Sequence, residues 1–102
     1  MRSNKSISEE SLEIMHILEK NPHLTQRQLS KEIGSSIGKI NYCLKDLIDI
    51  GFIKMENFKN SNHKLKYSYV LTPEGIKQKI KVTKKYIEIK IEEFDKLNQY
   101  LD

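Results

Sequence analysis

The sequence predicts a mainly α-helical protein with a small β-hairpin and a long C-terminal helix. Three observations lead to this prediction. Apolar residues recur every three or four positions between residues 8 and 51, with breaks near Pro22 and Gly34, as in three short helices. Residues 52–71 instead alternate apolar and polar side chains around a polar stretch, KNSNHK, as in a hairpin. Helical spacing then returns and continues to Asp102.

The first two helices have start and stop signals. Ser8 can cap the first helix, and Pro22 stops it just after Asn21. Thr25 can cap a second, short helix, and Gly34 suits the left-handed turn that often follows a helix. Each helix should therefore bury one apolar face.

The third helix is predicted over residues 36–50. Ser35 or Ser36 can cap its start, and Gly51 ends it. Its apolar stripe consists of Ile37, Ile40, Cys43, Leu44, Leu47 and Ile48. The opposite face should be exposed to solvent.

The hairpin and the last helix follow. Alternation in LKYSYVL predicts that Tyr67 and Tyr69 pack the hairpin against the first or last helix. Thr72 as N-cap, Pro73 at the first helical position and Glu74 in the first turn form a strong helix start. A helix of about 30 residues would be about 45 Å long, more than a small core can cover.

The composition limits the classes of protein that fit. The 102 residues suit one small domain, and no apolar run approaches the ~20 residues of a membrane span. The N-terminal segment MRSNKSISEES lacks the apolar core of a signal peptide. The single cysteine, Cys43, cannot form an intramolecular disulfide and fits a reducing compartment. We therefore expect a cytoplasmic protein with no membrane partner.

The positive charge is concentrated in the middle of the chain. Residues 23–72 carry eight basic and four acidic side chains, a net charge of +4 that equals the formal charge of the whole chain. A local basic excess is typical of proteins that bind a polyanion, most often nucleic acid. A solvated lysine-rich surface would show the same excess, so charge alone does not decide.

The second and third helices, joined by the tight turn IGSS, form a predicted helix-turn-helix. Serines at the start of the third helix can bind a phosphate, and Gly38 lets the backbone approach another molecule. Asparagine can contact adenine and lysine can contact guanine in the major groove. The predicted DNA contacts of this recognition helix are Ser35, Ser36, Gly38, Lys39, Asn41, Tyr42 and Lys45. A protein-docking helix could also present such a polar face.

The hairpin tip is the second predicted contact. A lysine- and asparagine-rich tip directly after a recognition helix is typical of a wing, here residues 57–66, placed on the DNA backbone or minor groove. The candidate phosphate contacts are Lys59, Asn60, His63, Lys64 and Lys66. Together with the recognition helix, they favour double-stranded DNA as the partner.

The strings IGKINYCLKDLI and ENFKNS, followed by YSYVLTPEG, resemble the winged helix-turn-helix of the MarR transcriptional regulators. More narrowly, they resemble a short subgroup associated with exopolysaccharide biosynthesis, over about residues 8–95. The resemblance implies a bacterial, cytoplasmic and nucleoid-associated homodimer that controls transcription, with polysaccharide genes as targets. The positions that match the family's recognition-helix contacts are Ser36, Gly38, Lys39, Asn41 and Tyr42. The wing lacks the Asp-x-Arg pair typical of the family, which favours phosphate contact over minor-groove reading.

The chain is expected to divide into a winged helix-turn-helix domain, residues 8–72, and a dimerisation helix, residues 73–102. Ile76 and Ile80 should pack on the first helix. Beyond Thr83, an apolar stripe would stay exposed unless a partner covers it. The predicted dimerisation residues are Ile87, Ile91, Phe94, Leu97 and Leu101.

Other functions are less consistent with the sequence. The three histidines lie far apart, and Cys43 has no companion at metal-ligand spacing, so we expect no metal and no cofactor. No phosphate loop, nucleophile elbow or convergent acid pair is present, so we expect no enzyme. One alternative from a different class stays open: a winged-helix adaptor whose basic face docks an acidic protein or RNA.

Overall fold

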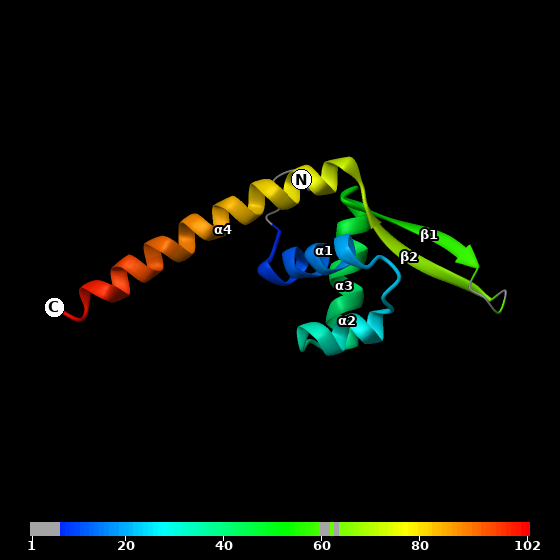
Figure 1. The fold of residues 1–102 in the computed structure, drawn as a ribbon, viewed down its shortest axis with the longest axis horizontal. Helices are drawn as coiled ribbons and strands as arrows, with labels where there is room; N and C mark the ends of the chain where they lie inside the picture. Colours follow the sequence, from blue (N-terminus) through cyan, green and yellow to red (C-terminus); the bar gives the residue numbers. More distant parts are fainter. Residues whose placement is uncertain (1–6, 60–61, 63) are drawn as a thin grey trace.

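The structure is a computed structural model that describes residues 7–59, 62 and 64–102. Helices α1 to α3 form a compact group, the hairpin of β1 and β2 projects from one side of it, and α4 projects from the other (Figure 1). The longest dimension is 63 Å. The elements are α1 (Glu9–Lys20), α2 (Gln26–Ile33), α3 (Ile37–Asp49), β1 (Ile53–Lys59), β2 (Leu65–Leu71) and α4 (Pro73–Gln99). The predicted fold class is confirmed.

The helix ends lie where the sequence signals place them. The side chain of Ser8 accepts a hydrogen bond from the backbone N–H of Ser11 at the start of α1. Thr25 and Gln28 form a reciprocal capping box at the start of α2, which satisfies two otherwise unpaired N–H groups. Gly34 has a φ of +81°, the left-handed conformation that a glycine adopts without strain, and it ends α2.

The core lies where the three short helices meet the first residue of the hairpin. Each side chain that is fully buried there stabilises the fold by about 1.5–3 kcal/mol relative to an exposed one. The largest fully buried side chains are Ile14, Met15, Leu18, Leu29, Ile40, Leu44, Leu47 and Ile53. The core therefore anchors the inner face of α3 and the base of the hairpin together.

The two strands pair antiparallel from Ile53 opposite Leu71 to Lys59 opposite Leu65. Only the base of this hairpin joins the core, because the described outer part extends beyond the helices (Figure 1). Tyr69 is half-buried and packs against the core, as predicted. The same prediction is wrong for Tyr67, which is 51% exposed, because it lies farther out along the strand.

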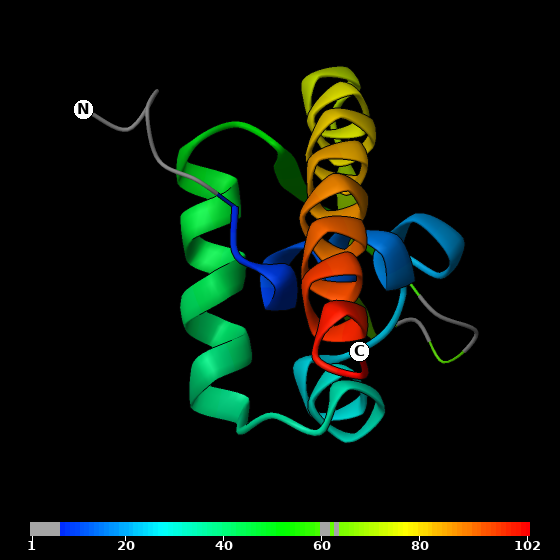
Figure 2. The same cartoon turned by 90° about the vertical axis from the view of Figure 1, so that its left-hand side faces the viewer.

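Helix α4 packs on α1 through its first half, and its second half extends beyond the core (Figure 1). In Figure 2 the same helix points toward the viewer and is seen almost end-on. Ile76 and Ile80, which were expected to pack on α1, are instead 39% and 53% exposed, and neither packs against the core. Val82 packs against the core instead. The buried face of α4 runs through Gly75 and Val82, so the two isoleucines lie on a neighbouring face of the helix.

Polar contacts fasten the two helices along this junction. The Tyr86 hydroxyl donates to the carbonyl of Ile7 at 2.7 Å. Lys79 pairs with Glu19, and Lys90 pairs with Glu9 at 3.1 Å. The hydrogen bond to Glu9 and the negative charge of that carboxylate raise the pKa of Lys90. Lys90 therefore carries its positive charge at neutral pH and loses it as the pH rises through the raised pKa.

None of the helices within the described residues is both long and apolar enough to cross a membrane.

The start of α4 has no room for a side chain at Gly75. A Cβ added there would lie 2.0 Å from the carbonyl oxygen of Phe52, a backbone atom that cannot rotate away. We predict that Gly75→Ala destabilises the protein by about 1–3 kcal/mol or more, measured by urea unfolding at fixed protein concentration. Gly38→Ala is the matched control. Its Cβ would meet nothing within 4 Å, so it should stabilise α3 by about 0.5–1 kcal/mol. Equal effects of the two substitutions would contradict this account.

Candidate nucleic-acid interface

The turn between α2 and α3 sets the position of the candidate interface. The Ser30 hydroxyl donates to the carbonyl of Ser35, and the Ser35 N–H donates to the carbonyl of Ser30 at 3.2 Å. These bonds close the turn, and the apolar face of α3 fixes the rotation of the helix. The buried residues of that face are Ile40, Cys43, Leu44 and Leu47. The opposite face of α3 is thereby turned to solvent.

Helix α3 covers Ile37–Asp49, within the predicted range of 36–50. Ser36 is its N-cap, because its hydroxyl oxygen accepts a hydrogen bond from the Lys39 N–H at 3.1 Å. Of the two candidate caps, the structure therefore selects Ser36. Ser35 instead lines a groove beside α1. The Ser36 hydroxyl proton is not used by the cap and could still be donated to an anion.

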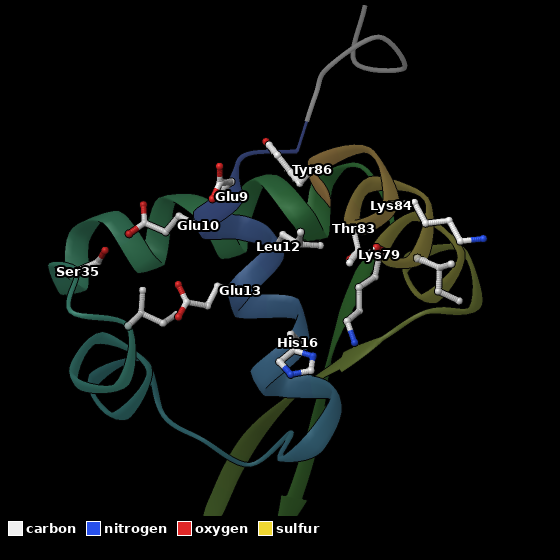
Figure 3. A pocket seen from close by; sticks show the side chains of 12 residues that line it. Glu9, Glu10, Leu12, Glu13, His16, Ser35, Lys79, Thr83, Lys84 and Tyr86 are labelled. Atoms are coloured by element: carbon white, nitrogen blue, oxygen red, sulfur yellow. Dashed lines mark hydrogen bonds between the residues drawn. The ribbon is translucent and has the colours of Figure 1, made fainter. Parts of the chain in front are cut away.

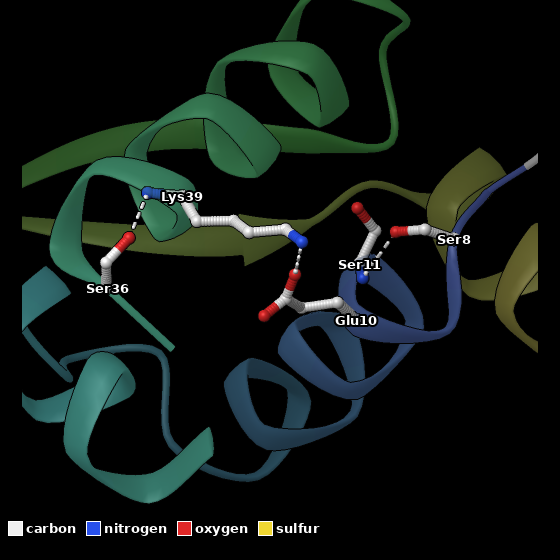
Figure 4. A network of polar contacts seen from close by, with 5 residues as sticks. All are labelled: Ser8, Glu10, Ser11, Ser36 and Lys39. Carbon is white, nitrogen blue, oxygen red and sulfur yellow. Dashed lines mark hydrogen bonds and ion pairs between the residues drawn. The ribbon is translucent and has the colours of Figure 1, made fainter. Parts of the chain in front are cut away.

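The predicted contact residues of α3 fall on three sides of the helix. Gly38, Tyr42 and Lys45 are exposed on the side away from the core. Asn41 lies on the side toward α2, where its Nδ2 donates to Oε1 of Gln26. Lys39 lies on the side toward α1, where its Nζ is 3.3 Å from Oε1 of Glu10 (Figure 4). Lys39 was predicted to face DNA, and the structure adds a carboxylate that shares its charge.

The hairpin carries further lysines near its tip. Lys59, Lys64 and Lys66 are exposed at the outer ends of the two strands. The predicted contacts Asn60 and His63 lie outside the described residues. Nearer the base of β1, Lys54 pairs with Glu56 at 3.2 Å, which offsets its charge. The basic character of the hairpin thus lies mainly toward its tip.

A polar chain that the sequence did not predict joins the hairpin to α3. Nε2 of Gln26 donates to the Tyr69 hydroxyl at 3.1 Å, and Nδ2 of Asn41 donates to Oε1 of Gln26 at 3.3 Å. The three residues are far apart in sequence and come from α2, β2 and α3. A polar residue at the first position of a helix gives no signal for such a contact. We call this set, Tyr69, Gln26 and Asn41, the amide relay.

A second feature missed by sequence reasoning is an open groove between α1 and α4, with a volume of about 810 Å³. Figure 3 shows Glu10 and Glu13 of α1 on one side and Lys79 and Lys84 of α4 on the other, with Leu12 and His16 between them. No periodicity within one helix could reveal it, because its lining comes from α1, from α4 and, through Ile33 and Ser35, from the end of α2 and the turn after it. Within the described residues, no three potential metal ligands gather there or elsewhere.

Comparisons with known proteins agree with this geometry. A family model described as winged helix-turn-helix DNA-binding matches residues 9–54, from α1 to the start of β1. The fold is a winged helix-turn-helix. No curated protein matches the sequence.

Solved structures show the same winged helix-turn-helix arrangement. FabT of Streptococcus pneumoniae, crystallised in complex with DNA, is 22% identical, with a TM-score of 0.59 over 90% of this chain and 62% of FabT. MepR, a transcription regulator of a Staphylococcus aureus multidrug efflux pump, is 19% identical, with a TM-score of 0.64 over 94% of this chain and 76% of MepR. AdcR of Streptococcus pyogenes is 18% identical, with a TM-score of 0.63 over 95% of this chain and 69% of AdcR.

These likenesses establish the fold. Another AdcR structure that matches, at 16% identity and a TM-score of 0.61, is described as that of a zinc-dependent MarR family transcriptional regulator. The chain spans less than two thirds of the length of FabT.

Proposed function

We propose that this protein is a transcription regulator that binds double-stranded DNA as a homodimer, with α3 in the major groove and the wing on the backbone. The exposed side of α3 carries the proposal: a winged helix-turn-helix leaves this side uncovered, and here it presents Gly38, Tyr42 and Lys45. FabT, which shares the fold, was crystallised with DNA. We assign DNA contact to the residues of α3 and the wing predicted above.

The distribution of charge favours insertion of α3 by its N-terminal end. Lys39 and Lys45 lie in its first nine residues, whereas Asp46 and Asp49 lie in its last turn. A recognition helix usually contacts base edges through its N-terminal residues. In that orientation the lysines approach the phosphates and the two aspartates stay farther from them.

The apolar stripe of α4 supports the homodimer. Phe94 is 66% exposed and Leu101 is 83% exposed, and such a continuous apolar surface is costly in water. The exposed stripe consists of Ile76, Ile80, Ile87, Ile91, Phe94 and Leu97 on α4, with Leu101 two residues beyond the end of the helix. Four of these, from Ile80 to Leu101, recur every seven residues, the spacing of a coiled-coil seam. A second copy of α4 is therefore the partner that fits this stripe.

We assign DNA binding to residues 8–72 and dimerisation to residues 73–102. A two-fold pair would carry two copies of α3 and could read half-sites about 34 Å apart. The strings IGKINYCLKDLI and ENFKNS support exopolysaccharide genes as the targets. The site of action would then be the bacterial nucleoid, in the cytoplasm.

Binding to duplex DNA of varied sequence tests the function. The protein should prefer its operator over random duplex by a factor of about 10³ or more. Asn41→Ala should lower this ratio, because a base contact is lost, whereas Lys59→Ala should weaken binding to all duplexes alike and reduce the salt slope by about 0.9. Fluorescence anisotropy across a salt series measures both. Salt-insensitive binding without sequence preference would instead favour the adaptor that docks an acidic protein or RNA.

The ion pair between Glu10 and Lys39 should weaken DNA binding. Glu10→Gln removes a negative charge near the proposed interface and frees Lys39 for a phosphate. We predict an affinity gain of roughly 2- to 5-fold at low salt that shrinks as salt is added. Glu13→Gln, one turn farther along α1, removes the same charge without releasing Lys39. Equal gains from the two variants would show that the Lys39 pair is not the cause.

The dimer is tested by two matched substitutions on α4. Ile87→Lys places a charge on the apolar stripe and should shift the protein to monomer, which sedimentation equilibrium measures. Ile89→Lys makes the same exchange two positions away, on roughly the opposite side of the helix, and should leave the dimer intact. A monomeric wild-type protein, or a dimeric Ile87→Lys, would refute dimerisation through this stripe.

A further inference from the structure

The amide relay connects three elements of the winged helix-turn-helix. Tyr69 lies on β2, Gln26 on α2 and Asn41 on α3. The Gln26 side chain lies between the other two: its Nε2 donates to Tyr69 and its Oε1 accepts from Asn41. The residues are 43 and 15 positions apart in sequence, so only the tertiary fold brings them together. Tyr69 is itself held, because its N–H donates to the carbonyl of Pro22 at 3.0 Å.

We propose that Gln26 and Tyr69 are positioning residues that hold the Asn41 carboxamide in the orientation for reading a base. This inference rests on the proposed DNA binding and deepens it. Asn41 touches the base. Gln26 and Tyr69 act through Asn41 and set how strongly one base pair is preferred at the position that Asn41 reads.

The hydrogen-bonding capacity of Asn41 fits this role. A carboxamide has two N–H donors and one carbonyl oxygen, and the relay uses one N–H. The oxygen and the second N–H stay available, and these are the two groups that contact N6 and N7 of adenine in a bidentate pair. The relay therefore orients the side chain and still leaves it one acceptor and one donor for a base.

The degree of exposure favours positioning over fold stabilisation. Asn41 is exposed, and the hydrogen bond between it and Gln26 lies at the surface, where water competes for both partners. Such a bond contributes little to folding. Its larger effect is on Asn41 itself, because an exposed side chain that is already ordered loses less conformational entropy when it binds.

The relay also couples the wing to base reading. Tyr69 lies on β2, whose outer end carries the lysines of the wing. A wing drawn toward the phosphates would keep the Tyr69 hydroxyl, and through Gln26 the Asn41 carboxamide, in place. Loss of the Tyr69 hydroxyl should therefore lower sequence preference although that hydroxyl is not assigned a DNA contact.

The test measures sequence preference, defined as the ratio of dissociation constants for duplexes that differ at the base pair to which Asn41→Ala is most sensitive. Gln26→Ala and Tyr69→Phe should each lower this ratio by roughly 3- to 10-fold, part of the roughly 5- to 150-fold that a bidentate contact supplies. Tyr67→Phe, on the same strand, removes a hydroxyl outside the relay and should leave the ratio unchanged.

A double-mutant cycle separates positioning from a general structural effect. In the Asn41→Ala background, Gln26→Ala should have no further effect on the ratio, because nothing is left to position. A Gln26→Ala effect of the same size in both backgrounds would overturn the inference. So would a wild-type ratio in Gln26→Ala.

A second readout needs no DNA. In ¹⁵N-labelled protein, the side-chain NH₂ resonances of Asn41 should shift in Gln26→Ala and Tyr69→Phe but not in Tyr67→Phe. Unshifted Asn41 resonances in both relay variants would overturn the inference whatever the DNA results. A wild-type protein without any sequence preference would overturn the proposed function and the role of the relay with it. Preference that is sensitive to Asn41 but not to Gln26 would overturn the relay alone.

Discussion

The burial of one face of α3 is the constraint on which the rest of the structure depends. Ile40, Leu44 and Leu47 are almost completely buried against the other helices, so α3 cannot rotate about its axis without exposing them. This burial decides which side chains reach solvent. The α2–α3 turn then fixes where the helix begins, and the base of the hairpin, through Ile53, enters the same core. The exposed side of α3 and the hairpin are thus positioned by one set of apolar contacts.

The environment of the exposed residues divides them into different roles. Tyr42 and Lys45 face outward, Asn41 is held from the α2 side, and Lys39 shares its charge with Glu10. A helix with a uniform basic face would bind any duplex. Here amide hydrogen bonds hold Asn41 on one flank and a carboxylate offsets the charge of Lys39 on the other. In the proposed DNA complex this arrangement would support selectivity more than raw affinity.

Much of the fold follows from local signals in the sequence. The caps at Ser8, Thr25 and Thr72, the left-handed Gly34 and the change from helical to alternating periodicity predicted every element. The prediction failed for Ile80, because periodicity shows that a helix has an apolar face but not which neighbour it meets. Contacts between helices distant in sequence, such as Gln26 with Tyr69, leave no local pattern. The groove between α1 and α4 was not predicted from the sequence for the same reason.

The close contact of Gly75 with the carbonyl of Phe52 has a geometrical consequence. The first turn of α4 contacts the backbone of Phe52, and farther along the helix Tyr86 bonds to Ile7 and Lys90 pairs with Glu9. These contacts fix the direction in which α4 leaves the core. In a two-fold pair joined through α4, this fixed direction would set how far apart and at what angle the two subunits lie. The separation of the two α3 helices would then be determined inside each subunit, and a tilt of a few degrees at this joint would be magnified over the length of the arm into a change of register along the double helix.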